Sequence, residues 1–406
     1  MENNFNIKQK GMNETNFSKL SRVDIVDALR GYAVMAIVII HSVEHFIYPV
    51  YPDKTLQPEW LVALDSVVFN MVFSLIAGKG YSIFALLFGF TFYVQFKNQE
   101  NKGSDFRGRF IWRLLILSVF ATINAAFFPG GDVLMLFVFT GLSLVLVCKL
   151  NNKVIFIIAA ICLMQPIELF HFISSRVNEG YTLPNLNVGG LYEIVQEGVK
   201  NGNWSNFFIE NTTTGQKASL LWAVGGGRFV QTIGLFLLGF LLSRKNSFVD
   251  SLENTKFWIK LLIGSSIAFG LLYPLRVEWY DNGPTEIIKN SIGTALDMWQ
   301  KLSFTLVIVS SFVITYYNSP LKKYKEKLQI YGKMSLTNYV TQSIIGALIF
   351  FPIGLNLSPY LGYTASLGVG ILIFLVQLYF CNLWSKYYKQ GPLEKLWHKA
   401  TWIGKR

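Results

Sequence analysis

Charged residues are scarce in this chain. Of its 406 residues 15% are charged and 52% are hydrophobic, whereas soluble domains carry about 25% charged residues. One or two soluble domains have too little interior to hide this much apolar surface. The composition therefore argues against a soluble globular enzyme, and equally against a disordered chain, a collagen or a coiled coil.

Alternating segments of about ten residues, which build membrane β-barrels, are also lacking. The apolar runs are instead about 18–22 residues long, the length of a membrane-spanning α-helix. The sequence therefore predicts an all-α polytopic membrane protein whose main partner is the lipid bilayer.

Cysteine is rare as well, with Cys148, Cys162 and Cys381 all in apolar segments and none in a paired spacing. This pattern disfavours a disulfide framework or a zinc ribbon. Acidic residues number 24 against 36 basic ones, a net charge of +12. In a membrane protein such an excess reflects loops that stay in the cytoplasm, so no nucleic-acid partner is expected.

The apolar runs predict about ten spans. They lie at roughly 29–48, 63–96, 110–127, 133–149, 154–172, 224–243, 257–275, 300–317, 335–352 and 362–384. The second run contains Gly78-Lys79-Gly80, which predicts a broken helix or an extra half-turn. We expect one transmembrane domain over residues 24–385, between tails of residues 1–23 and 386–406.

Orientation follows from the basic residues of the loops. With the N-terminus inside, the inside segments carry 26 Lys and Arg and the outside segments carry 7. Both termini are therefore predicted to be cytoplasmic. No signal peptide is expected, because the first residues lack an apolar core. The largest outside loop spans about 173–223; its amphipathic stretch either lies on the membrane, caps a cavity or is simply part of a long loop.

The first predicted helix carries a polar stripe. Arg30 and His41 are eleven steps apart, which places them on one helix face about 16 Å apart along the axis. Asp27 lies within pairing reach of Arg30, and Glu44 and His45 share the face of His41. One interpretation is a polar channel in which Glu44 positions His41 as a general base or acyl carrier. The other is an Asp27–Arg30 pair and two histidines that only mark the membrane boundaries.

Two other cations interrupt apolar sequence: Lys79, which glycines flank on both sides, and Arg228, which three glycines precede. Lys79 is predicted to line the same cavity as His41. Arg228 begins its span from the outside, where it either meets a substrate or snorkels to the interface. On the cytoplasmic side Arg30 and Arg113 suit phosphate groups, although a cluster near Arg113 is equally explained by the positive-inside bias.

Three uncharged or acidic groups complete the candidate substrate site. Asn124 and Asp132 flank the outer end of the third predicted helix, where they either orient His41 or cap helices. Gln342 in the ninth predicted span either contacts a ligand or bonds a neighbouring helix. The segment HSVEH also fits a metalloprotease pattern, but it needs a third zinc ligand, and only His171 is placed for it, so no metal is expected.

Several segments resemble the YeiB-like membrane proteins (domain of unknown function 418). They are DALRGYAVMAIVIIH at the first helix, GKGYSIFALLFGF (78–90), GGDVLMLF (130–137), GRFVQTIGLFLLGFLL (227–242), GKMSLTNYVTQSII (332–345) and KYYKQGPLEKLWHKAT (386–401). Lys79 and Asp132 stand at positions that this family's elements share. Many relatives carry Asn where this chain has His41 and His where it has Asn124.

The first segment also looks like the opening helix of the wider transmembrane acyltransferase superfamily. That resemblance implies an acyl group moved from cytoplasmic acyl-CoA, such as acetyl-CoA, to an envelope glycan or lipid in the bacterial inner membrane. His41 would be the central group, with Arg30, Lys79 and Arg113 on the donor side. The other functions kept open are a transporter whose polar stripe is a substrate or proton path, and a membrane metalloprotease. A homo-oligomer is also left open.

Overall fold

Every regular element that the structure describes is a helix. The computed structural model describes residues 23–47, 50–317 and 322–404, and no β-strand occurs within these ranges. The α-helices are α1 (Asp24–Glu44), α2 (Glu59–Ile76), α3 (Lys79–Glu100), α4 (Arg107–Phe127), α5 (Leu134–Val147), α6 (Asn152–Leu163), α7 (Pro166–Val177), α8 (Val188–Lys200), α9 (Trp204–Glu210), α10 (Gln216–Gly225), α11 (Arg228–Arg244), α12 (Leu252–Arg276), α13 (Glu286–Ile288), α14 (Thr294–Tyr317), α15 (Lys322–Lys333), α16 (Ser335–Phe350), α17 (Tyr363–Ser385) and α18 (Pro392–Thr401). Shorter elements are the 3-10 helix η1 (Lys54–Leu56) and the π-helical turns η2 (Asn211–Gly215), η3 (Val277–Asp281) and η4 (Lys289–Gly293).

Among the described residues, six helical stretches are long and apolar enough to cross a membrane. They are Asp24–Glu44, Glu59–Glu100, Arg107–Phe127, Leu252–Asp281, Glu286–Tyr316 and Tyr363–Ser385. Two bent pairs raise the number to eight if each pair is one span: α6 with α7, bent by 50°, and α9–α10 with α11, bent by 76°. The chain is therefore a helical protein with the composition of a membrane protein.

The expectation of about ten spans is wrong. The runs at 133–149 and 335–352 fold as α5 and α16, which have 14 and 16 residues. A span needs about 20 residues, and shorter apolar helices more often belong to a buried core. Hydropathy alone cannot separate the two cases, because a core helix is as apolar as one that faces lipid.

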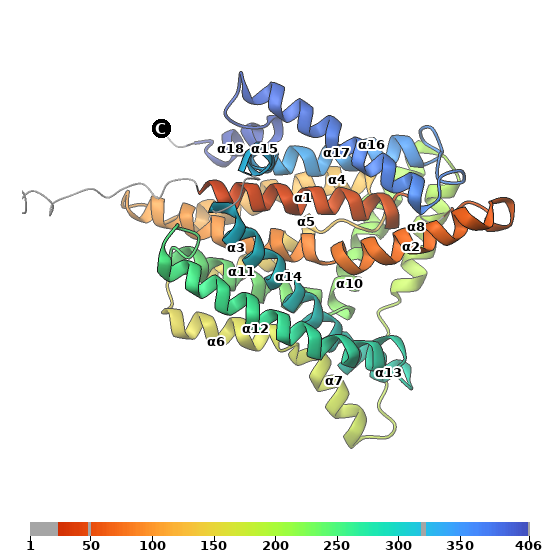
Figure 1. Ribbon diagram of the computed structural model, residues 1–406, viewed down its shortest axis with the longest axis horizontal. Coiled ribbons are helices and arrows are strands. Elements are labelled where there is room, and N and C mark those ends of the chain that lie inside the picture. Colours follow the sequence, from red (N-terminus) through yellow and green to blue (C-terminus); the bar gives the residue numbers. More distant parts are fainter. Residues whose placement is uncertain (1–22, 48–49, 318–321, 405–406) are drawn as a thin grey trace, which may run out of the picture.

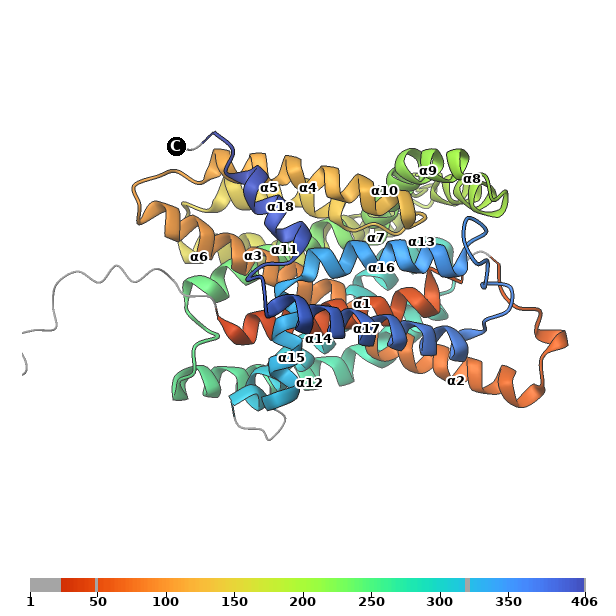
Figure 2. The ribbon, with the colours of Figure 1, turned by 90° about the horizontal axis from the view of Figure 1, so that it is seen from above.

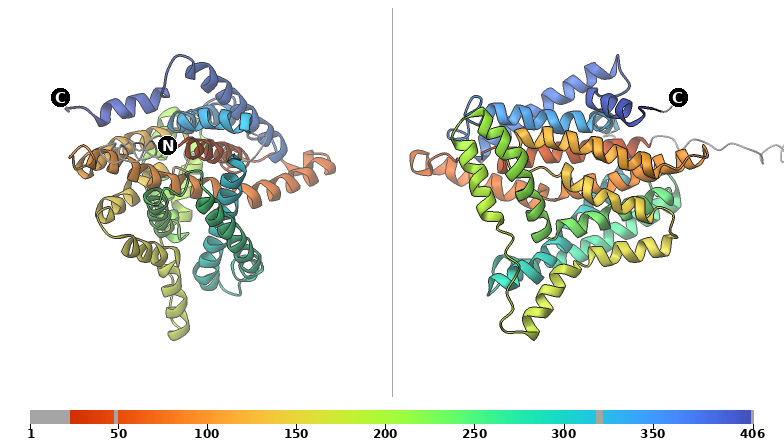
Figure 3. Two further views of the ribbon diagram at one scale, coloured as in Figure 1. Left: turned by 60° about the vertical axis from the view of Figure 1, so that its left-hand side comes forward. Right: turned by 180° about the vertical axis from the view of Figure 1, so that it is seen from behind.

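Helix α1 lies at the centre of the bundle (Figure 1; Figure 3, left). The helices α3, α15, α16 and α17 pack around it. Its apolar stretch is 78% buried inside the protein, compared with 22% for Glu59–Glu100 and 11% for Leu252–Asp281. The polar stripe of the first helix therefore faces the interior of the bundle, while α2 and α12 supply exposed apolar faces suited to lipid.

The two ends of the bundle are built differently. Helix α18 packs against α4 and α16 near the beginning of α1, at the left of Figure 1. Helices α8 and α9 lie at the opposite end, beyond the end of α4 (Figure 2). The segment 173–223, expected as an outside loop, is thus largely helical and contributes the end of α7, α8, α9 and most of α10.

Two of the joints between helices depend on a glycine with positive φ. Gly78 has φ 77° and precedes α3, so the helix is interrupted near Lys79, which is one of the two predicted alternatives. Gly227 has φ 69° and precedes α11, so that Arg228 begins a new helix. Glycine adopts this left-handed conformation without the steric cost that other residues carry. The joint at Gly227 bends the chain by 76°, so that Arg228 leaves the line of the preceding helix.

We expect Gly227→Ala to destabilise the protein by about 1–3 kcal/mol. Alanine would be strained at this positive φ, and its Cβ would stand 2.7 Å from Gln165 Oε1. Gly264→Ala is the control, because a Cβ there meets nothing within 4 Å in the middle of α12. Thermal unfolding of the detergent-purified variants measures both changes. An unchanged midpoint in Gly227→Ala would contradict the role given to this joint.

The tail segment QGPLEKLW docks α18 onto the start of α16. The Glu394 carboxylate accepts hydrogen bonds from Leu336 N at 2.7 Å, Thr337 N at 3.1 Å and Thr337 Oγ1 at 2.6 Å. These bonds satisfy two of the backbone N–H groups that a helix start leaves open. Gly391 lies close enough that a Cβ would meet Glu394 Oε2 and Thr337 Oγ1. The tail is therefore a structural cap for a helix of the bundle.

Removal of this cap has a predictable effect. Glu394→Ala should lower stability by about 1–2 kcal/mol, since it leaves buried N–H groups unpaired. Burial raises the pKa of Glu394, so the docking is strongest below the usual range of a carboxyl and weakens as pH rises through the raised pKa. Thermal unfolding between pH 5 and 8 tests this, with the exposed Glu326→Ala as control. A pH dependence equal to wild type in Glu394→Gln would contradict the assignment.

Candidate functional site

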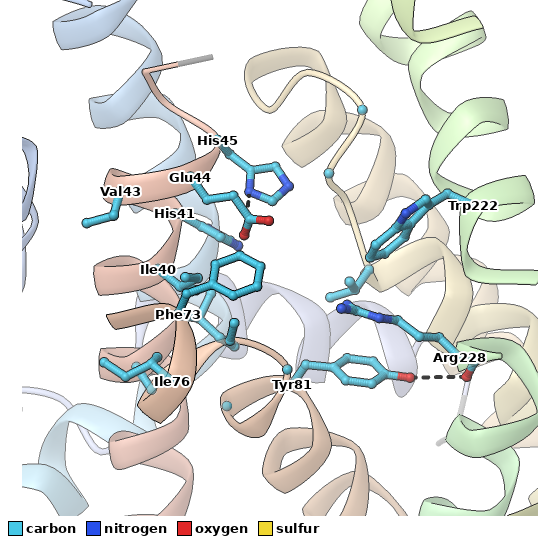
Figure 4. A pocket seen from close by; sticks show the side chains of 18 of the residues that line it. Ile40, His41, Val43, Glu44, His45, Phe73, Ile76, Tyr81, Trp222 and Arg228 are labelled. Carbon is cyan, nitrogen blue, oxygen red and sulfur yellow. Dashed lines mark hydrogen bonds and ion pairs between the residues drawn. The ribbon is translucent and has the colours of Figure 1, made fainter. Parts of the chain in front are cut away.

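A pocket of about 430 Å³ opens at the end of α1 that is remote from α18. Its wall comes from α1, the α2–α3 joint, the turn between α4 and α5, and α8, α10, α11, α14, α16 and α17. Figure 4 shows the side chains of α1 on one side of the pocket and those that surround Arg228 on the other. The segment 173–223 thus contributes to the pocket, because Tyr192 of α8 and Trp222 of α10 line it.

His41 lies in the pocket wall at the last turn of α1, with 8% of its surface exposed. Its ring packs on Phe128 with centroids 4.3 Å apart, and the rings of His45, Phe46 and Tyr339 surround it at 5.4, 6.0 and 6.2 Å. No described group bonds its Nδ1 atom. Aromatic packing, rather than a hydrogen bond, therefore holds this imidazole.

The Glu44 carboxylate also lines the pocket, but it approaches a different histidine from the one expected. Its Oε2 atom lies 3.4 Å from Nδ1 of His45, and Figure 4 shows the two groups side by side. Glu44 was predicted to position His41, but among the described residues no hydrogen bond joins the two side chains, and Nδ1 of His41 has no partner. Whether either group takes part in chemistry stays a prediction.

Arg228 faces the pocket from the start of α11. Its guanidinium lies 4.2 Å from the ring centroid of Trp222 and 5.5 Å from that of Tyr81. The Tyr81 ring is held in turn by its hydroxyl, which bonds Thr232 and the carbonyl of Arg228. Within the described ranges no carboxylate pairs with this guanidinium and no acceptor receives a hydrogen bond from it. Arg228 is thus oriented by aromatic rings and keeps its donors for another partner.

Lys301 is a second pocket cation, and it already has a partner. Its Nζ lies 2.5 Å from Asp297 Oδ2, and the other carboxylate oxygen of Asp297 receives a bond from Arg276 Nε at 3.2 Å. Asp297 is 2% exposed. A buried carboxylate shared by two cations fixes the start of α14 to the end of α12.

Lys79 does not line the pocket, although Gly78 and Gly80 beside it do. Its side chain turns away, donates a hydrogen bond to the Ser74 carbonyl at 2.7 Å and lies 5.5 Å from the ring centroid of Phe304. The amine therefore holds the end of α2 against α3 and α14. The predicted contact of Lys79 with the cavity is made by its neighbouring glycines.

Asn124 and Asp132 bond each other and cap α5. Asn124 Nδ2 donates to Asp132 Oδ1 at 2.9 Å, and the same carboxylate receives bonds from Leu134 N at 3.2 Å and Met135 N at 3.1 Å. Burial raises the pKa of Asp132 to about 7. Asp132 thus caps the start of α5, and Asn124 holds Asp132. The turn that this pair stabilises presents Phe128 to His41, and a contact of the pair with a substrate stays a prediction.

Gln342 is fully buried on α16, and neither polar atom of its amide has a partner among the described residues. It stands one turn after Tyr339, which does line the pocket. The sequence analysis missed Tyr339, Tyr81, Trp222 and Lys301. Lys301 had a usable signal, since it is a charge at the edge of an apolar run, but the aromatic residues had none in a chain so rich in them.

Arg30 and Arg113 lie toward the other end of α1. Arg30 donates to Asp27 Oδ1 at 2.7 Å and to Thr91 Oγ1 at 2.8 Å, which confirms the predicted pairing with Asp27. Arg113 stacks on Trp397, 3.6 Å from the ring centroid, and is close enough to Arg30 for their charges to interact. The structure thus brings two expected donor-side residues together, about 16 Å along α1 from His41.

A metal centre is not evident in the described part of the chain, where no group of three His, Cys, Asp or Glu side chains is placed to hold an ion. His171, the third ligand that a metalloprotease would need, lies 2.5 Å through Nδ1 from the hydroxyl of Tyr181. The structure therefore gives no support to the metalloprotease interpretation.

Comparison with known proteins places the chain among uncharacterised relatives. Residues 242–404 match the family model "Protein of unknown function (DUF418)". The chain is similar to the uncharacterized protein YxaH of Bacillus subtilis (strain 168), with 25% identity over 94% of both chains. It is also 24% identical to an uncharacterized 39.9 kDa protein of Bacillus acidopullulyticus, again over 94% of both. The uncharacterized protein YeiB of Escherichia coli (strain K12) is 34% identical over 70 residues, which are 17% of this chain and 18% of YeiB. No solved structure matches the chain.

Proposed function

We propose that this chain, which belongs to the YeiB-like DUF418 family, is an acyltransferase of the bacterial inner membrane. The acyl group would come from acyl-CoA on the cytoplasmic side, where both termini lie. It would reach a hydroxyl group of a cell-envelope glycan or lipid in the pocket at the outer end of α1. The excess of Lys and Arg in the loops at the α18 end supports this orientation.

One observation carries the proposal: His41 and Arg228 line the same pocket from opposite walls. A neutral imidazole is the usual general base for a hydroxyl nucleophile. A guanidinium suits an anionic part of a substrate or the negative charge that develops on a carbonyl oxygen. A base for the acceptor hydroxyl and a cation for the developing negative charge in one pocket are a combination that favours acyl transfer.

The proposed transfer is a single displacement at the thioester carbonyl carbon. The acceptor oxygen forms a bond to the thioester carbonyl carbon while His41 accepts the hydroxyl proton. The carbon–sulfur bond then breaks, and the thiolate of CoA leaves and takes up that proton. Arg30 and Arg113, which lie near each other at the far end of α1, would hold the phosphates of the donor.

The test is consumption of acyl-CoA by the purified protein in native-lipid nanodiscs, followed as release of free CoA thiol. Acetyl-CoA, succinyl-CoA and a long-chain acyl-CoA are compared, with a radiolabelled acyl group to trace the acceptor. Transfer of label to an envelope component is the expected result. No binding and no turnover of any donor by folded protein would overturn the proposal.

A transporter is the second candidate, and the two bent helix pairs favour it. The α6–α7 break and the α10–α11 break meet beside the pocket, because Gly227 lies against Gln165 and Glu168. Broken helices around a binding site are typical of secondary transporters. Uptake of a labelled anion into proteoliposomes without any acyl-CoA would support this function instead.

A further inference from the structure

We infer that the pocket binds an anionic amphiphile, whose acidic group pairs with Arg228 and whose hydrocarbon part lies against α2. This inference deepens the proposed function, and it rests on that function only in taking the bound molecule as the acyl acceptor. The expected ligand has a phosphate or carboxylate group joined to an apolar chain.

Arg228 presents its guanidinium to the pocket. Two aromatic rings, Trp222 and Tyr81, orient its guanidinium toward the pocket. Among the described residues no acceptor pairs with it, while the neighbouring Lys301 is already bound to Asp297. The donors of the Arg228 guanidinium are therefore free to bind a group that enters the pocket. An anion would be such a group, and a guanidinium binds phosphate or carboxylate through two parallel hydrogen bonds.

The pocket's own carboxylate does not fill this place. Glu44 lies beside His45 at 3.4 Å, on the α1 side of the pocket and across from Arg228 (Figure 4). Glu168 lies behind the backbone of Gly227 rather than in the pocket wall. The lining residues with full charges are therefore Glu44, Arg228 and Lys301. The charge of Glu44 acts on Arg228 only across the pocket, and among the described residues no carboxylate contacts the Arg228 guanidinium.

Part of the pocket wall across from Arg228 is apolar (Figure 4). Helix α2 lines the pocket with Phe69, Phe73 and Ile76. On its other side α2 exposes Val67, Met71 and Leu75, each with about half or more of its surface accessible. It packs mainly on α1 and α17, and Asp65 fixes it to the start of α17 through Tyr363 N and Thr364 N. A single helix therefore separates the pocket from the surrounding lipid.

The size of the pocket suits a ligand with one charged end and one apolar end. About 430 Å³ lies in the range of sites for small molecules and holds a headgroup with a short length of chain. A two-chain lipid would have to leave its tails against the apolar surface of α2. A ligand with a charged end and an apolar end matches both walls, whereas inorganic phosphate matches only one.

The experiment measures lipid binding to the full-length protein in an uncharged detergent, without acyl-CoA. The probes are a short-chain phosphatidylglycerol, the phosphatidylcholine of the same chain length, and inorganic phosphate. Binding is read by calorimetry, and bromine-labelled phosphatidylglycerol reports on the pocket by quenching Trp222, which lies 4.2 Å from the Arg228 guanidinium. We expect saturable binding of phosphatidylglycerol at least tenfold tighter than that of either other probe.

Two variants test whether the ligand contacts Arg228 on one side of the pocket and α2 on the other. Arg228→Gln should weaken phosphatidylglycerol binding at least tenfold, and Phe73→Ala should weaken it severalfold. Arg176→Gln is the matched control, because Arg176 also lies over a ring, that of Phe172 at 5.2 Å, but outside the pocket. Each variant must give the wild-type elution profile and unfolding midpoint. Arg228→Lys, which keeps the charge, substitutes for Arg228→Gln if that variant does not fold.

The outcomes distinguish an anionic lipid from a soluble anion. They also distinguish a failure of this inference from a failure of the proposed function. Equal affinity for phosphatidylglycerol and phosphatidylcholine would overturn the pairing with Arg228. Equal affinity for inorganic phosphate and phosphatidylglycerol would overturn the amphiphile and point to a soluble anion. Because no acyl-CoA is present, a lack of acyl transfer does not affect this result. Conversely, transfer that persists while phosphatidylglycerol fails to bind would overturn the inference and leave the proposed function standing.

Discussion

Replacement of His41 by glutamine is expected to lower the rate of acyl transfer by about 10²–10⁴-fold, the usual contribution of a general base. Glutamine fills much of the space of the imidazole but cannot accept a proton at neutral pH. The ring is held by Phe128, Phe46 and Tyr339 rather than by hydrogen bonds at Nδ1, so the variant should still fold. The measurement is single-turnover transfer of labelled acyl group in nanodiscs at saturating acyl-CoA.

Two histidine variants serve as controls for this result. His171→Gln removes an imidazole that bonds Tyr181 outside the pocket, and it should keep the wild-type rate. His45→Gln removes the imidazole beside Glu44 and should cost far less than His41→Gln. If His45→Gln alone abolished transfer, the base would be His45. Transfer within threefold of wild type in His41→Gln would reject the role of this residue.

Acyl-CoA binding separates chemistry from donor recognition. His41→Gln should bind acyl-CoA as the wild type does, because His41 lies about 16 Å along α1 from Arg30. Arg30→Gln should weaken binding of the donor, although it also removes the bonds to Asp27 and Thr91. Calorimetry on the purified proteins, with the unfolding midpoint measured in parallel, distinguishes a lost donor site from a lost fold.

The part of the fold that follows from local sequence could be predicted. Helix α1, the break at Gly78 and the pairing of Asp27 with Arg30 depend on residues near each other in the chain. The number of spans could not be obtained in this way. Helices α5 and α16 are as apolar as a span, and their shortness appears only once the turns that bound them are known.

The candidate site was likewise predictable only where it depends on residues close together in the chain. Helical periodicity placed His41 and Glu44 on one face of α1, and both line the pocket. Other lining groups come from α3, α8, α10, α11, α14 and α16, so their meeting with His41 and Glu44 depends on tertiary packing. Trp222 illustrates this: nothing near it in sequence marks it, and it matters because the turn at Gly227 brings Arg228 back over its ring.

The largest loss of stability is expected at Asp297. Its carboxylate is 2% exposed and is shared by Lys301 and Arg276. Asp297→Ala would leave two cations around a site from which their common anion has been removed. Breaking a buried ion pair from one side costs about 3–5 kcal/mol, because the remaining charge stays desolvated. The unfolding midpoint of the detergent-purified protein should fall accordingly.

Asp281 offers a matched control on the same arginine. It also forms an ion pair with Arg276, but 40% of its side chain is exposed. Exposed pairs contribute about 0–1 kcal/mol, so Asp281→Ala should barely move the midpoint. Equal effects of the two substitutions would contradict the view that Asp297 joins α12 to α14. Since Lys301 lines the pocket, a destabilised Asp297→Ala would also release this lysine, and the pocket would gain a second cation without an anion.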